Sequence, residues 1–344
     1  MRCTVAAACL AFVVSLGMAQ SGGDFAGKPV AYSRNLMSRA ESGSARDQFF
    51  LARAYATGSG VKQDYAQALY WYRRAANRGD DGAITEIGRI YAEGFGVAQN
   101  YEQALLWFRR GASDGDAPSQ NNLGLMCFRG LGMRPDPAAA VRWWERAAKK
   151  ELPQAVSNLG YAYITGSGVP RDATQACKLF RKAADRGLAD AEFNLGYCYE
   201  KGVGAGQDYA EALRWYEKAA EQNYPPAQVN LGFLYLQGRG VSANLPEALM
   251  LFARAAENGN PKAFLGLAQM YHMGKGVARD DISAYAWLEL ARMRGEPVDE
   301  ALQITGRALS KQELARAVER AGTWSATHNA ERMALNAQSF APGQ

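Results

Sequence analysis

Side chains that could do acid–base, nucleophilic or metal chemistry are scarce in this chain. Its 344 residues include two histidines, His272 and His328, and five cysteines. Neither histidine lies in a recognisable motif, and a His-rich metal site needs more ligands than the sequence holds. We therefore expect both histidines to be surface residues, and we predict no bound metal and no cofactor.

One short motif could belong to a nucleophilic enzyme. Ser59 and Lys62 have the Ser-x-x-Lys spacing of penicillin-interacting enzymes. The other elements of that motif set are absent, and the equivalent turns elsewhere hold unrelated residues such as Phe95 or Arg239 in place of the serine. We predict a protein that is not an enzyme. The alternative is a weak penicillin-binding or β-lactamase-like protein, or a protein that binds cell-wall fragments.

The overall composition is that of a folded, water-soluble protein. Apolar residues make up 48% of the chain and charged residues 21%, which excludes a disordered chain and a membrane protein with many spans. The net charge of +5 arises from 39 basic and 34 acidic residues. Such a mixed surface does not suggest a nucleic-acid-binding arm, so we predict no nucleic-acid partner.

The first residues have the pattern of a secretory signal peptide. Arg2 precedes an uncharged run that ends in Gly17-Met18-Ala19, so we predict a signal peptide over residues 1–19 with cleavage after Ala19. The apolar run is shorter than the roughly 20 residues that span a bilayer, which makes a retained anchor the alternative. No later stretch reaches that length. We expect a periplasmic or secreted protein without a transmembrane segment in its mature chain.

The elements of the chain follow a period of 36 residues. Gly-x-Gly recurs seven times at this interval, at Gly58/Gly60, Gly94/Gly96, Gly130/Gly132, Gly166/Gly168, Gly202/Gly204, Gly238/Gly240 and Gly274/Gly276. The segment before each pair places Ala, Leu-Gly and Tyr on one helical face, and the segment after it does the same with Ala, two large apolar residues and Ala-Ala. Asp or Asn opens each second segment, as expected of a helix N-cap. The period therefore predicts helix hairpins.

These hairpins define the predicted domain organisation. We expect an all-α protein, an α/α superhelix or solenoid of seven hairpins with capping helices at both ends. Residues 20–43 form a linker and an N-terminal capping helix, residues 296–324 form C-terminal capping helices, and residues 325–344 are predicted to be a disordered tail. The seven repeats occupy residues 44–79, 80–115, 116–151, 152–187, 188–223, 224–259 and 260–295.

The repeat resembles a known family. Its pattern is Ala-x-x-x-Leu-Gly-x-x-Tyr-x-x-Gly-x-Gly-Val, followed by Asp-Tyr-x-x-Ala-x-x-Trp-Tyr-x-x-Ala-Ala-x-x-Gly, and it is similar to the Sel1-like repeat, a relative of the tetratricopeptide repeat. The resemblance covers residues 44–295. It implies a scaffold or adaptor that binds a protein or peptide. For a secreted member it implies a part in envelope assembly, exopolysaccharide secretion, signalling or host interaction.

The resemblance also indicates where a partner would bind. In tetratricopeptide-like stacks the first helix of each hairpin lines the concave side, so the residues two before and two after the core Leu or Ile should face the partner. These pairs are Phe49/Arg53, Thr85/Arg89, Asn121/Leu125, Ser157/Tyr161, Phe193/Tyr197 and Val229/Phe233, and beside them runs a row of Asn122, Asn158, Asn194 and Asn230.

Two interpretations of this groove stay open. In the first, the Asn amides bind an extended peptide backbone, the aromatic residues take its side chains, and Arg53 and Arg89 hold acidic groups. In the second, the Asn side chains bond to the adjacent helix and the aromatic residues pack at hairpin junctions.

The cysteines allow one crosslink. Cys177 lies ten residues before Gly187 and Cys198 eleven residues after it, so an antiparallel pair of helices hinged there places both at the same height. A disulfide bond and two buried thiols are both compatible with this spacing. Cys127 is left unpaired and is expected in the core. The sequence makes no prediction of the oligomeric state.

Overall fold

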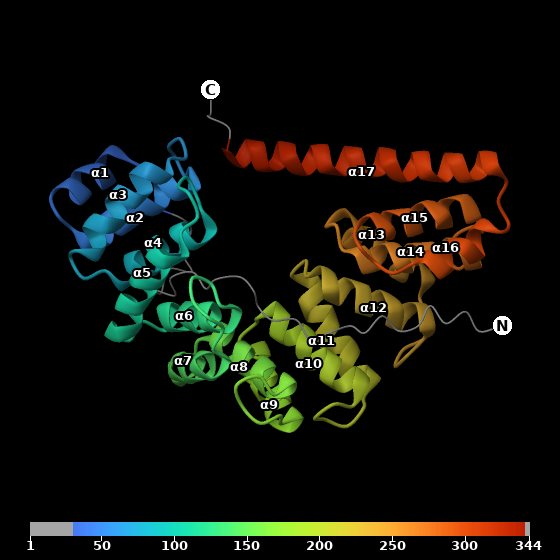
Figure 1. Cartoon of the computed structure of the whole chain (residues 1–344), viewed down its shortest axis with the longest axis horizontal. Coiled ribbons are helices and arrows are strands. Elements are labelled where there is room, and N and C mark those ends of the chain that lie inside the picture. The colour runs from blue at the N-terminus through green and yellow to red at the C-terminus, as the bar shows by residue number, and fades with distance from the viewer. Residues whose placement is uncertain (1–29, 341–344) are drawn as a thin grey trace. The chain divides into compact units, whose positions relative to one another are not determined.

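Every regular element of the structure is an α-helix. The computed structural model describes residues 30–340, and within this range the chain forms seventeen helices and no β-strand (Figure 1). Consecutive helices pair as hairpins that repeat along the chain. The predicted all-α repeat superhelix is therefore confirmed. The predicted signal peptide, residues 1–19, lies outside the described residues.

The helices gather into two compact units, residues 30–186 and residues 187–339. The boundary lies one residue before the end of the fourth predicted repeat. The N-terminal unit consists of α1 (Arg34–Glu41), α2 (Ala45–Thr57), α3 (Tyr65–Ala76), α4 (Asp81–Glu93), α5 (Tyr101–Asp114), α6 (Ala117–Arg129), α7 (Pro137–Lys149), α8 (Pro153–Thr165) and α9 (Ala173–Ala184). The C-terminal unit begins with α10 (Ala189–Lys201), α11 (Tyr209–Glu221), α12 (Pro225–Gln237), α13 (Leu245–Glu257), α14 (Pro261–Met273) and α15 (Asp281–Met293).

Local signals start and stop the helices of each hairpin. Asp64 opens α3, where its carboxylate accepts hydrogen bonds from the N–H groups of Ala66 (2.9 Å) and Gln67 (3.0 Å). Gly58 closes α2 in the left-handed conformation, with φ of 70°. A side-chain cap satisfies N–H groups that lack a partner in the first turn, and glycine adopts positive φ without the steric cost that a side chain adds.

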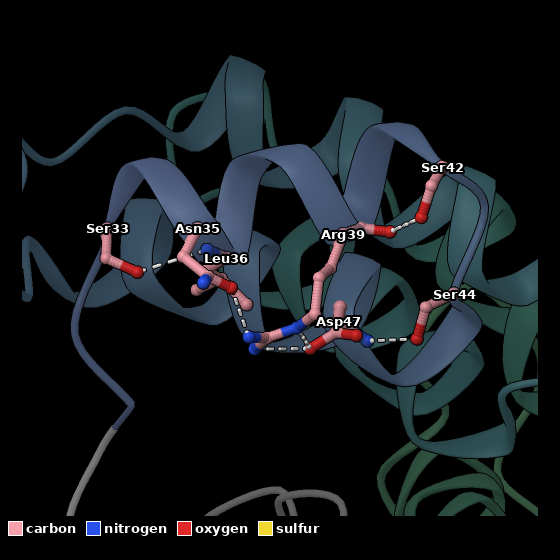
Figure 2. Close-up of polar contacts among 7 residues, drawn as sticks. All are labelled: Ser33, Asn35, Leu36, Arg39, Ser42, Ser44 and Asp47. Atoms are coloured by element: carbon pink, nitrogen blue, oxygen red, sulfur yellow. Dashed lines mark hydrogen bonds and ion pairs between the residues drawn. The ribbon is translucent and has the colours of Figure 1, made fainter.

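The capping helix α1 is joined to the first repeat by polar contacts (Figure 2). Ser33 caps α1 and Ser44 caps α2. Arg39 of α1 donates hydrogen bonds from Nε (3.1 Å) and Nη2 (2.9 Å) to Oδ1 of Asp47 in α2. Leu36, on another face of α1, is buried against the first hairpin.

The Leu-Gly pair of the repeat has a packing explanation. In the third repeat, a Cβ atom added to Gly124 would lie 2.6 Å from Nε1 of Trp144, a fully buried side chain of the second helix. The same arrangement joins Gly196 of α10 to Tyr216 of α11, at 2.7 Å. Glycine therefore lets the two helices of a hairpin approach closely around one large aromatic ring.

The C-terminal end differs from the expectation of a disordered tail after residue 324. Two helices follow the last hairpin, α16 (Asp299–Gly306) and α17 (Lys311–Phe340). Gly322 does not end α17, because a single glycine inside a helix costs only about 1 kcal/mol and proline is absent from the segment. Trp324 packs on Phe264 and Trp287, which anchors the middle of the helix. No helix within residues 30–340 has the length and apolar character needed to cross a membrane.

Candidate partner-binding surface

The first helices of the repeats are α2, α4, α6, α8, α10, α12 and α14, and most of their surface is covered by other helices. The structure therefore divides the predicted groove residues, apart from Arg89, into two groups. In the first group, every side chain is at most 1% exposed, which removes these residues from direct contact with a partner. It consists of Phe49, Thr85, Asn121, Asn122, Leu125, Ser157, Asn158, Phe193, Asn194, Val229 and Asn230.

The buried aromatic residues of this group pack inside the repeats. Phe193 of α10 lies against Tyr216 and Tyr224, with ring centroids 5.6 and 5.7 Å away. Phe49 of α2 lies 5.6 Å from Tyr72 of α3. These rings fill the space between helices, so the prediction that they take partner side chains is not supported.

The asparagine row also forms bonds within the protein. In the N-terminal unit, Asn158 of α8 donates from Nδ2 to Oδ1 of Asn121 in α6, at 3.0 Å. In the C-terminal unit, Asn230 of α12 donates from Nδ2 to the hydroxyl oxygen of Tyr216, at 2.9 Å. Buried amides that bond neighbouring helices are not available to a peptide backbone. The structure thus supports the interpretation in which asparagine links adjacent helices.

Arg89 has a partner of its own. Its Nε and Nη2 atoms donate to Oε2 of Glu86 at 3.0 and 2.7 Å, and its guanidinium lies 5.3 Å from the ring centre of Phe95. Burial disfavours the charged form of Arg89, but the Glu86 carboxylate outweighs that effect, so the pKa of Arg89 is raised. Arg89 is charged and already neutralised by Glu86, which argues against a role in holding acidic groups of a partner.

The second group keeps contact with solvent. Arg53 and Tyr161 are partly exposed in the N-terminal unit, and Tyr197 and Phe233 are partly exposed in the C-terminal unit. Tyr161 lies 6.0 Å from Phe128, and the ammonium group of Lys201 lies 5.8 Å from the ring centre of Tyr197. These side chains are held by neighbours while part of each remains open to a partner.

The structure adds residues that the sequence analysis missed. The residues four positions after the second member of each pair are exposed on the same helices: Thr57, Glu93, Arg129 and Thr165 in the N-terminal unit, and Lys201 and Gln237 in the C-terminal unit. A helical spacing of four was the available signal. We call the second group together with these residues the first-helix surface, and within each unit it is the candidate binding site.

A buried acidic network in the C-terminal unit was also missed. Glu200 of α10 is 6% exposed, and its Oε2 accepts a hydrogen bond from the hydroxyl of Tyr216 at 2.8 Å. Burial, followed by the charge of Glu200, raises the pKa of Tyr216 well above its usual value. Glu200 occupies the position of Ala56 and Leu236 in other repeats, and this departure from an apolar pattern was the signal in the sequence.

The candidate chemical residues do not form an enzyme-like arrangement. Ser59 lies in the turn after α2, where its carbonyl oxygen accepts a hydrogen bond from the N–H of Tyr32 at 2.8 Å. His272 is partly buried and pairs through Nδ1 with Asp281 at 2.7 Å, and His328 stacks on Trp324. Among the side chains of residues 30–328, those of His, Cys, Asp and Glu form no group of three that could hold a metal ion. Cys127 is buried and free, and Cys177 and Cys198 are also buried.

Comparison with known proteins identifies the repeat. The family model of the Sel1 repeat matches seven segments, residues 45–80, 82–116, 117–152, 153–188, 189–224, 225–260 and 262–296. A Sel1 repeat protein from Oxalobacter formigenes is 35% identical, with 77% of each chain covered and a TM-score of 0.60. The structure of c5321, a protective antigen of uropathogenic Escherichia coli displaying an SLR fold, is 27% identical, covers 90% of this chain and 82% of its own, and has a TM-score of 0.48.

Among curated proteins, none matches the chain. The seven matched segments nevertheless span well over half of its residues, at the period found in the sequence and on the hairpins found in the structure. The chain belongs to the Sel1-like repeat family.

Proposed function

We propose that this protein is a non-enzymatic adaptor that binds a protein or peptide along its first-helix surface. Sel1 repeats form scaffolds for protein–protein interaction, which sets the general class. The observation that carries the proposal is that partly exposed Arg or aromatic side chains recur at one repeat position in each unit, Arg53 and Tyr161 in the N-terminal unit and Tyr197 and Phe233 in the C-terminal unit. Arg and Tyr are among the residue types that contribute most binding energy at protein interfaces.

The chemistry of this surface favours recognition through side chains. The buried Asn121, Asn158 and Asn230 bond within the protein, so an extended backbone finds no row of free amides there. The rings of Tyr161 and Tyr197 are flat and partly shielded from solvent, and exposed polar residues such as Thr165 and Lys201 lie next to them on the same helices. A partner with apolar side chains and a polar rim fits such a surface.

We propose a periplasmic or secreted location for this activity. The proposal rests on the predicted signal peptide, residues 1–19, and on the absence of a helix able to cross a membrane within residues 30–340. Envelope assembly, exopolysaccharide secretion, signalling and host interaction are the settings that the family resemblance implies. The Sel1-like scaffold fits each of these settings through partner binding.

Affinity capture from envelope extracts tests the proposal. The double variant Tyr161→Ala/Tyr197→Ala removes one ring from the first-helix surface of each unit. We expect it to lose partners that the unmodified protein captures. Met250→Ala/Met293→Ala is the control, because both are exposed side chains on second helices, α13 and α15, that lie outside the first-helix surface. Capture of the same set of proteins by the double variant and the unmodified protein contradicts the assignment of the surface.

A further inference from the structure

The second helices of the N-terminal unit carry a concentrated positive charge. Together α3, α5, α7 and α9 contain ten Lys or Arg and three Asp or Glu, a net charge of +7. The first helices of the same unit, α2, α4, α6 and α8, contain four basic and four acidic residues and are neutral. We call the Lys and Arg side chains of these four second helices the basic face.

The charge is not a general property of second helices. In the C-terminal unit, α11, α13 and α15 contain four basic and seven acidic residues, a net charge of −3. The two units share the same repeat and the same core pattern. The difference in charge between them therefore does not follow from the packing of the hairpins.

The basic face is continuous across the N-terminal unit. Arg110 of α5 donates from Nη2 to the carbonyl oxygen of Ala76 at the end of α3, at 3.0 Å. Lys150, just after α7, donates from Nζ to the carbonyl oxygen of Gly115 just after α5, at 2.6 Å. These bonds link α3 to α5 and the end of α5 to the end of α7, so the cations of these second helices follow one another along the unit.

Many of these cations lack an acidic partner. Arg109, Arg142 and Lys178 are exposed, and none of them pairs with a carboxylate within residues 30–328, whereas Lys182 of α9 lies 3.7 Å from Glu151. Three further arginines lie over indole rings one turn earlier, and one example is Arg146, 4.5 Å from the ring centre of Trp143. A guanidinium stacked in this way keeps N–H groups at its edge available for phosphate or carboxylate oxygens. The uncompensated charge therefore favours an anionic partner.

Two large apolar side chains lie on the same face. Tyr70 of α3 is 50% exposed and Leu106 of α5 is 59% exposed. They occupy the same repeat position, one helical turn before Arg74 and Arg110. A bilayer interface accepts cations at the level of the phosphates together with tyrosine and leucine side chains just below them. A hydrophilic acidic polymer offers no apolar layer for Tyr70 and Leu106.

We propose that the basic face docks this protein on the surface of a bilayer rich in anionic phospholipid. The cations lie against the headgroup phosphates, while Tyr70 and Leu106 enter the interfacial layer. This surface lies on the second helices, so docking leaves the first-helix surface of the N-terminal unit accessible. The inference is independent of the proposed protein partner, because it involves different residues and a different kind of ligand.

Sedimentation with vesicles tests the proposal on the full chain. We expect the protein to bind vesicles that contain phosphatidylglycerol and not vesicles of pure phosphatidylcholine. Raising the salt from about 0.1 M to about 1 M should release it, because the Debye length falls from about 10 Å to about 3 Å. The triple variant Arg109→Gln/Arg142→Gln/Lys178→Gln should weaken binding on the order of 100-fold, given the attraction of each cation to an anionic surface.

A matched variant separates the basic face from total charge. Lys218→Gln/Arg254→Gln/Arg292→Gln removes the same charge from second helices of the C-terminal unit and should bind vesicles like the unmodified protein. An equal loss of vesicle binding in the two triple variants would overturn the proposal. Tyr70→Ser/Leu106→Ser should weaken vesicle binding at unchanged charge. Binding to an acidic polysaccharide without binding to phosphatidylglycerol vesicles would assign the face to a polymer instead and would also overturn it.

Discussion

At the residue scale, one hydroxyl group joins three buried side chains. The hydroxyl of Tyr216 donates to Glu200 at 2.8 Å and accepts from Nδ2 of Asn230 at 2.9 Å. Tyr216→Phe leaves both neighbours without that partner. We expect the free energy of unfolding to fall by about 1–3 kcal/mol, the cost of leaving buried polar groups unpaired. Denaturant unfolding measures the change.

The repeat supplies a matched control for this variant. Tyr72 of α3 occupies the equivalent position in the first repeat and is 1% exposed, but its hydroxyl has no hydrogen-bond partner among the side chains of residues 30–328. Tyr72→Phe should therefore change the free energy of unfolding less than Tyr216→Phe does. Equal losses would show that the network around Glu200 adds nothing to stability.

Alkaline pH should weaken the C-terminal unit through the same tyrosine. Burial raises the pKa of Tyr216 well above its usual value, and burial with the nearby Glu217 raises the pKa of Tyr235 to about 12. A group with a raised pKa holds its proton more tightly in the folded state. Its contribution is complete below the unfolded value of about 10 and is lost as the pH rises above it. The denaturation midpoint should therefore fall as the pH rises above that value, and it should fall less steeply for Tyr216→Phe than for the unmodified protein. The same dependence of the midpoint on pH in both proteins would contradict this.

The positions of single residues on the first helices explain why the sequence predicted only part of the candidate surface. At 3.6 residues per turn, the residues two before and two after the core Leu lie only about 40° apart on the helix. The structure buries Phe193 and Val229 but leaves Tyr197 and Phe233 partly exposed. In a solenoid each first helix packs on its own second helix and on neighbouring repeats. The solvent-facing sector is therefore narrow, and a single repeat pattern does not fix its edges.

At the element scale, the glycine in the turn after a first helix allows neighbouring repeats to pack closely. Gly168 follows α8 with φ of +79°, and a Cβ atom there would lie 2.3 Å from the carbonyl oxygen of Pro137 in α7. Gly79 has φ of +85°, but nothing lies within 4 Å of its Cβ position. Gly79→Ala should cost about 1–2 kcal/mol from backbone strain alone. Gly168→Ala should lower the free energy of unfolding by clearly more than Gly79→Ala does, because the carbonyl oxygen of Pro137 must move to make room for the added methyl group.

Thermal unfolding of the two glycine variants measures this difference. Both variants introduce the same methyl group at a positive φ, so strain in the backbone is matched between them. A lower melting temperature for Gly168→Ala than for Gly79→Ala is the expected order. The same melting temperature for both would show that the turns do not restrict the contact between neighbouring repeats.

The elements themselves were largely predictable because their signals are local. Asp64 and Gly58 mark helix ends whatever the rest of the chain does, and the 36-residue period repeats those marks. The C-terminal end has no repeat to compare with. The continuation of α17 beyond Gly322 depends on tertiary contacts of Trp324, which no local pattern encodes.

At the scale of the whole molecule, the net charge is a sum over surfaces that carry different charges. The net charge of +5 suggested a mixed surface, yet the second helices of the N-terminal unit reach +7 and those of the C-terminal unit −3. The period predicts which residues of each repeat are buried, because that requirement is shared by all copies. Exposed positions are free to differ from repeat to repeat, so the location of charge emerges only when residues are placed on their helices.

At this scale we also predict a disulfide bond between Cys177 and Cys198, which the spacing of the two cysteines around Gly187 allows. Cys177 lies in α9 and Cys198 in α10, and both are buried. A bond that closes a loop of about 20 residues adds about 3 kcal/mol of stability in the chain-entropy model. Reduction should therefore lower the denaturation midpoint. Alkylation of the unfolded mature chain should label Cys127 alone before reduction and all three cysteines after it, whereas labelling of all three without reductant would contradict the bond.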